Sequence, residues 1–120
     1  MGLDMLAYKT REQVADFGFK EPDDSVEIQY WRKHPNLHGW MEQLYQDKGG
    51  TEIFNLTTVR LDEADIDALE SAVQQNRLPD TSGFFFGESQ PEDKEDDLLF
   101  ISAARQALKE GYAVFYTSWW

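Results

Sequence analysis

Apolar residues recur at helical spacing in three stretches of the chain, and this periodicity limits the fold more than any other feature. The clearest stretch begins at Pro35, which suits the first position of a helix, and ends at Gly49 and Gly50. Its apolar stripe follows the i, i+3, i+4, i+7, i+8 pattern and consists of Leu37, Trp40, Met41, Leu44 and Tyr45. The pattern predicts a helix that buries this face.

Two further helices are expected in the second half of the chain. Asp62 is placed to cap a helix, with Asp65 three residues later in the pattern of a capping box. The buried face of this helix would consist of Ile66, Leu69 and Val73. The acids of residues 92–97 favour the first turns of the third helix, because they would meet the positive end of its dipole. The apolar face of the third helix consists of Leu98, Ile101, Ala104, Ala107 and Leu108.

Strand-like segments lie between and around these helices. They are predicted at residues 3–8, 26–31, 53–59 and 112–120, from apolar runs, alternation and β-branched content. With 120 residues the chain can bury one real core. We therefore expect a single α+β domain over residues 1–120, with about three helices packed on a mixed sheet of about four short strands.

Composition excludes several classes of function. The chain has no cysteine, so a disulfide framework, a zinc–thiolate site and a thiol nucleophile are excluded, and a reducing cytoplasm is the expected location. The net charge of −12 would repel DNA, RNA and anionic membranes, so neither direct nucleic-acid binding nor membrane binding is expected. No motif indicates a cofactor, and none is predicted.

The aromatic residues are bunched beside polar ones instead of being spread along element faces. This bunching suggests a pocket for a nucleotide or another anion, in which cations after the second strand and hydroxyls in the loop of residues 81–87 face aromatic walls. The candidate ligand-binding residues are Trp31, Arg32, Lys33, His34, His38, Trp40, Thr81, Ser82 and Phe85. The pocket requires that the corner after Trp31 and the loop of residues 81–87 meet in space. The structural alternative is a plain strand-to-helix corner, with two of the three phenylalanines at 84–86 filling the core between Gly83 and Gly87.

A metal site is a weaker possibility. His34 and His38, extended by Glu42, would lie on one strip of a helix at i, i+4 spacing. Pro35 places His34 at the helix boundary, and no glutamate stands where a metalloprotease motif needs its general base. No metal is therefore predicted.

Several short motifs are spread over nearly the whole chain. They are Met1-Gly2-Leu3-Asp4-Met5, Tyr30-Trp31-Arg32-Lys33, Leu37-His38, Trp40, Leu78-Pro79, Thr81, Gly83-Phe84-Phe85-Phe86-Gly87, Tyr116 and Ser118-Trp119. In these residues the chain resembles a family of small proteins of unknown function from phages and prophage-bearing bacteria. Family members are often labelled phosphoglycerate kinase by automatic transfer, yet 120 residues without a recognisable nucleotide site do not supply that enzyme's two-domain cleft. The resemblance implies an accessory phage-type protein and gives no catalytic residue.

Two functions from different classes follow from these observations. The preferred one is a protein-binding module, such as an inhibitor of a host nucleic-acid enzyme, whose contact surface is formed by the acids of residues 62–70 and 88–97. It requires these acids to gather on one face. The alternative is a small-ligand or enzymatic module that uses the aromatic-walled pocket.

Overall fold

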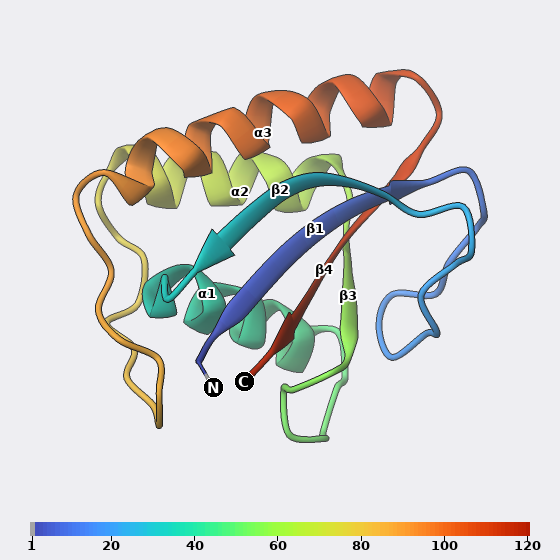
Figure 1. Cartoon of the computed structure of the whole chain (residues 1–120). Helices are drawn as coiled ribbons and strands as arrows, with labels where there is room; N and C mark the ends of the chain where they lie inside the picture. Colours follow the sequence, from blue (N-terminus) through green and yellow to red (C-terminus); the bar gives the residue numbers. More distant parts are fainter. Residues whose placement is uncertain (1) are drawn as a thin grey trace.

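The computed structural model of the chain describes residues 2–120 and contains four strands and three helices (Figure 1). In chain order these are β1 (Asp4–Thr10), β2 (Val26–Arg32), α1 (Pro35–Asp47), β3 (Thr58–Leu61), α2 (Glu63–Gln74), α3 (Asp93–Lys109) and β4 (Ala113–Trp119). The predicted α+β class with three helices on a four-stranded sheet is confirmed.

The sheet has the order β2-β1-β4-β3, and every pairing in it is antiparallel, whereas a mixed sheet was expected. The direction of β4 follows from the two helices before it. Arg105 of α3 bonds Asp67 of α2, and Lys94 of α3 bonds Asn76 beyond the end of α2, so these helices run antiparallel. The pair returns the chain to the end of the sheet where β3 finished, and β4 then runs back along β3.

All three helices pack on one face of the sheet. Side chains of that face, such as Met5, Ala7 and Tyr116, share one buried cluster with Met41 of α1 and Phe100 of α3. Helix α1 lies across the strands near the two chain ends, and α2 and α3 lie toward the opposite end (Figure 1). The expected apolar stripes of the helices therefore supply the core.

The other face of the sheet is only partly covered. Phe115 is fully buried there because Phe19, from the long segment between β1 and β2, packs edge-on against it at 5.1 Å and Tyr8 stacks on it at 5.4 Å. Nearer the chain ends, Tyr30 and Trp119 on the same face stay exposed. This end of the sheet therefore lacks an apolar cover.

The third strand differs from its prediction. Residues 53–57 form a loop instead of the start of a strand, and β3 begins only at Thr58. Leu56 has a φ of 57°, which is incompatible with an extended strand, and its amide bonds the carbonyl of Ser118 at 2.9 Å. Ile53 and Leu56 point into solvent as a result.

None of the described helices has the length and apolar character that a membrane-spanning helix requires.

The cap of α2 gives a direct test of the sequence-derived fold. The carboxylate of Asp62 accepts from the amide of Asp65, and the carboxylate of Asp65 accepts from the amide of Asp62, both at 2.9 Å. We expect Asp62→Ala to lower the free energy of unfolding by about 1 kcal/mol, because one amide of the first turn loses its acceptor. Urea unfolding measures the loss. Asp62→Asn keeps an acceptor oxygen and should retain most of the stability, so equal losses in the two variants would contradict the capping role.

Candidate functional site

The segments that carry the bunched aromatic and polar residues meet at one end of the molecule. Helix α1 begins there, directly after β2, and residues 78–92 pass beside that start before α3 begins (Figure 1). Lys33, with a φ of 57°, makes the turn between β2 and α1, and its amide bonds the carbonyl of Leu3 at 2.8 Å. This turn fixes where His34 and the first amides of α1 lie.

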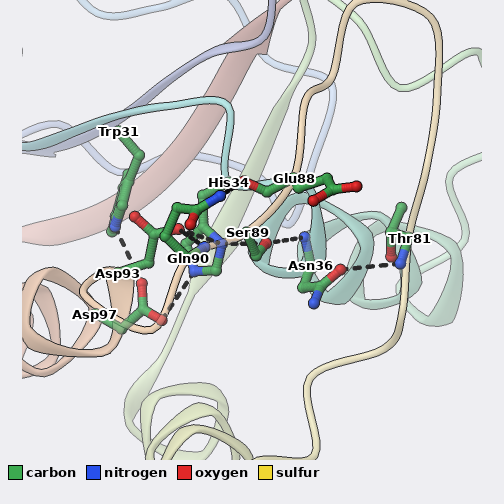
Figure 2. Close-up of polar contacts among 9 residues, drawn as sticks. All are labelled: Trp31, His34, Asn36, Thr81, Glu88, Ser89, Gln90, Asp93 and Asp97. Atoms are coloured by element: carbon green, nitrogen blue, oxygen red, sulfur yellow. Dashed lines mark hydrogen bonds and ion pairs between the residues drawn. The ribbon is translucent and has the colours of Figure 1, made fainter.

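A buried carboxylate on α3 organises the polar part of this end (Figure 2). Asp97 is 2% exposed, and its Oδ1 accepts from Nε1 of Trp31 at 3.1 Å. Its Oδ2 lies 3.0 Å from Nε2 of His34, which is also buried. A buried carboxylate is costly unless donors satisfy it, and here both oxygens have one. The first turns of α3 are thereby joined to the end of β2 and to the corner before α1.

Ser89, which is distant in sequence, supplies a hydrogen-bond acceptor to the first turn of α1. His34 is the N-cap residue, but its side chain does not cap the helix. The hydroxyl oxygen of Ser89 accepts from the amide of Asn36 at 3.0 Å and lies 2.6 Å from Nδ1 of His34. The hydroxyl therefore satisfies one amide that helix geometry leaves free and also engages the imidazole.

Asn36 and Gly39 hold the long loop against α1. Oδ1 of Asn36 accepts from the amide of Thr81 at 3.0 Å. A Cβ atom at Gly39 would lie 1.9 Å from Oγ1 of Thr81, so only glycine permits this approach of loop and helix. The corner after Trp31 and the loop of residues 81–87 are thus in contact, as the pocket hypothesis required.

Two hollows lie on either side of the contact between Asn36 and Ser89. The larger has a volume of about 380 Å³, and the smaller has a volume of about 340 Å³. The larger is lined by His34, Asn36, Ser89, Asp93, Asp97 and Lys94, together with Val73, Leu78 and others from the ends of α2 and the loop. The smaller is lined by Pro35, Asn36, Asp80, Thr81, Ser82, Gly87, Glu88 and Ser89.

His38 lies one turn further along α1, in an aromatic environment. Its ring lies 5.1 Å from that of Phe54 and 5.3 Å from that of Phe86, and Nδ1 lies 2.8 Å from the hydroxyl oxygen of Tyr116. Burial lowers the pKa of His38 to about 4 and raises the pKa of Tyr116 well above its usual value. The buried pair therefore consists of a neutral imidazole and a protonated Tyr116 hydroxyl, joined by one hydrogen bond.

Trp120 joins three segments at the same end. Its ring lies 5.2 Å from that of Phe86, and its Nε1 donates to the carbonyl of Phe54 at 2.9 Å. Each of the joined segments carries large apolar side chains that are exposed. We call this set the apolar end; it consists of Ile53, Leu56, Phe84, Phe85 and Trp119, which are 50–80% exposed. The remaining exposed large apolar side chains among residues 2–120 are Val26 and Tyr30 of β2 and Leu99 of α3.

The structure separates several of the predicted site residues. His34 lines the larger hollow, and Thr81 and Ser82 line the smaller one. Arg32 pairs with Asp4 at 3.1 Å, and Lys33 lies against Gly87. Neither cation lines these hollows. Trp31 packs against Phe100, and Trp40 is half-buried at the edge of the core. Phe85 is in the apolar end, and His38 is buried away from both hollows.

The phenylalanine run also differs from its expectation. Only Phe86 is buried, whereas two of the three rings were expected to fill the core. Phe85 has a φ of 65°, and this left-handed backbone turns the chain so that Phe84 and Phe85 face solvent.

The histidine strip proposed as a weak metal candidate does not converge. His34 faces Asp97 and Ser89, whereas His38 faces Tyr116. Among residues 2–120, no three His, Cys, Asp or Glu side chains are grouped closely enough to hold a metal ion.

Sequence analysis missed the partners of the two histidines. Asp97 carried a usable signal, because it lies three and four residues before Phe100 and Ile101 and so occupies the apolar stripe of α3. An acid in such a stripe needs a buried donor. Asn36, Ser89, Asp93 and Tyr116 carried no comparable signal, since their roles depend on contacts between distant segments.

Comparison of the chain with protein-family models, with curated proteins and with solved structures gave no match. The assignment of function therefore depends on the geometry of this end of the molecule.

Substitution at Gly39 tests the packing of the long loop on α1. We expect Gly39→Ala to lower the free energy of unfolding by about 2 kcal/mol, because the new methyl group must displace Thr81. Adding Thr81→Ala removes Oγ1 and should recover at least half of the loss in a urea-unfolding double-mutant cycle. Additive losses would show that loop and helix are not in contact in solution.

The pKa of His38 predicts a stability change at mildly acidic pH. Its folded pKa of about 4 lies below the ordinary value of 6.5, so its contribution is complete above pH 6.5 and is lost as the pH falls toward 4. The full loss is about 3 kcal/mol. Urea unfolding at pH 7.0 and 4.5 should show a larger loss for the native protein than for His38→Gln, which keeps an acceptor for Tyr116. Equal losses would contradict a neutral buried His38.

Proposed function

We propose that this protein is an interaction module that binds a protein partner through the apolar end. The observation that carries the proposal is that Ile53, Leu56, Phe84, Phe85 and Trp119 are exposed on three segments joined by one residue, Trp120. Exposed large apolar side chains on neighbouring segments often mark an interaction surface on a folded protein. Aromatic side chains also supply most of the binding energy at many interfaces.

Backbone geometry supports the same proposal. Leu56 and Phe85 have φ values of 57° and 65°, a conformation that is unfavourable for residues other than glycine and asparagine. Each residue therefore combines an unfavourable backbone conformation with an exposed apolar side chain. Neither feature stabilises the free protein, whereas both are useful if the side chains are presented to a partner.

Charge indicates the chemistry of the partner. Exposed acids lie on the same loops as the apolar side chains, namely Glu52 before Ile53, and Asp80 and Glu88 around the phenylalanine run. With a net charge of −12, the protein favours a partner whose apolar contact surface has a basic rim. Enzymes that bind nucleic acid carry basic surfaces, so the specific form of the proposal is that the chain is a phage-type accessory protein that inhibits a host nucleic-acid enzyme.

The acidic groups on the helices are a poorer contact surface. Asp65 pairs with Lys48 at 2.8 Å, and Asp67 and Glu70 pair with Arg105 at 2.8 Å each, while Asp97 is buried. The antiparallel arrangement also separates the two acidic groups. The acids of residues 88–97 lie around Lys94 at the start of α3, whereas Asp67 and Glu70 lie beside Arg105. Lys94 and Arg105 are about 16 Å apart along the helix. The requirement that these acids gather on one face finds no support in this arrangement.

Two substitutions from different segments test the proposal. We expect Phe84→Ser and Trp119→Ser each to weaken binding by at least about tenfold, since central aromatic side chains commonly contribute more than 1 kcal/mol to binding. Proteins retained from host lysate are identified by mass spectrometry, and the affinity of each purified candidate is then measured at low and high salt. Leu99→Ser, which removes an equally exposed side chain from α3, is the matched control.

A partner that binds both variants and the control with equal affinity would contradict the proposal. A partner lost only when the acids of residues 88–97 are neutralised would indicate the acidic surface instead.

A further inference from the structure

We propose that Ser89, His34 and Asp97 form a nucleophile, base and orienting acid, and that the protein hydrolyses small neutral carboxylic esters in the larger hollow. This activity is additional to partner binding by the apolar end and uses different side chains. It follows from the order of the hydrogen bonds among three residues, from the hollow beside them and from the charges that line it.

With Asp97 ionised and the imidazole neutral, the hydrogen bonds allow one consistent assignment of protons. Asp97 accepts from Trp31 through Oδ1, so its Oδ2 accepts the hydrogen on Nε2 of His34. In the neutral ring, Nδ1 then carries a lone pair. Ser89 accepts from the amide of Asn36, so its own hydrogen is directed at Nδ1, 2.6 Å away. Each group is therefore placed to pass a proton in the direction that a serine nucleophile needs.

The arrangement matches the roles of a Ser-His-Asp triad with the two ring nitrogens exchanged. Nδ1 faces the serine and Nε2 faces the aspartate, and both nitrogens of an imidazole can act as the base. His34 and Asp97 are 3% and 2% exposed, so their positions are fixed by packing, whereas Ser89 is half-buried and lines both hollows. The nucleophile therefore lines the hollows, and its base lies between it and Asp97 (Figure 2).

The larger hollow has the size and lining for a small acyl substrate. Its volume of about 380 Å³ lies within the range of small-molecule sites. Val73, Leu78 and Pro91 offer apolar surface to an acyl chain. Asn36 also lines it, and its backbone amide donates to Oγ of Ser89 at 3.0 Å.

Charges in the hollow select a neutral substrate. Asp93 Oδ2 lies 3.5 Å from Nδ1 of His34, and Asp97 Oδ2 lies 3.0 Å from the other ring nitrogen, Nε2. Lys94 is the single cation of the lining. Because carboxylates outnumber the cation, a phosphate ester or an anionic acyl group is disfavoured.

The reaction proceeds in two balanced steps. Oγ of Ser89 attacks the carbonyl carbon while its proton moves to Nδ1 of His34, and the resulting imidazolium stays paired with Asp97. The ester C–O bond then breaks, the leaving alcohol takes the proton from Nδ1, and an acyl group remains on Ser89. In the second step a water molecule gives a proton to Nδ1 and attacks the acyl carbon, which releases the carboxylic acid and returns the proton to Oγ.

A fluorophosphonate probe tests for an activated serine directly. Oγ of an activated serine forms a bond to phosphorus as fluoride leaves, and peptide mass spectrometry locates the adduct. We expect the adduct on Ser89 of the full chain, no adduct in Ser89→Ala, and unchanged labelling in Ser102→Ala, which removes an exposed serine on α3. A folded native protein that remains unlabelled at Ser89 under conditions that fully label a serine esterase would overturn the proposal.

Turnover of p-nitrophenyl butyrate provides the second readout. We expect a burst of p-nitrophenol followed by slower turnover, and a loss of at least about 100-fold in rate for Ser89→Ala. Circular dichroism confirms that the variant is folded. An unchanged rate in folded Ser89→Ala would assign the hydrolysis to surface nucleophiles and overturn the proposal. Labelling of Ser89 at the native rate in a folded His34→Gln variant would overturn the role of His34 as the base.

Discussion

The buried carboxylate of Asp97 is the interaction on which the functional end of the molecule depends. It lies on the buried face of α3, where an unpaired charge would be strongly destabilising. Trp31 and His34 must therefore remain within hydrogen-bonding distance of it. These partners come from the end of β2 and the start of α1. One charge therefore fixes how a strand, a helix start and a second helix meet, and apolar packing alone would not set that register.

The pairing of Asp97 with His34 also determines how the loop of residues 78–92 is held. His34 presents Nδ1 to Ser89 because Asp97 holds its other nitrogen, and Ser89 in turn supplies the acceptor that the start of α1 lacks. Asn36 and Gly39 add a polar contact and a close approach to Thr81. The loop is thus held at two points on α1, and the intervening Phe84 and Phe85 can remain in solvent while Phe86 enters the core.

The sequence was informative where structure is local. The stripe of α1, the capping box at Asp62 and part of the face of α3 depend on residues within a few turns of one another, and these were predicted. The prediction for α3 omitted Phe100, which is fully buried. Prediction failed where backbone conformation or a distant partner decided the outcome. The β-branched content around Ile53 indicated a strand, yet the left-handed backbone at Leu56 ends any extended run there. The contacts of Ser89 link residues more than fifty positions apart, which periodicity does not report.

The two proposed activities share one piece of chain, and this has a physical consequence. Ser89 and the exposed phenylalanines lie on the same loop between α2 and α3. A partner that binds Phe84 and Phe85 would therefore also displace the segment that positions the serine hydroxyl. Glu88 and Gly87 line the smaller hollow directly beside Ser89. Pressure on the loop would change the distance between Oγ and Nδ1, which is 2.6 Å in the free protein. Because proton transfer depends steeply on that distance, partner binding and hydrolysis would be coupled through the loop, with no movement required of the sheet or of α3.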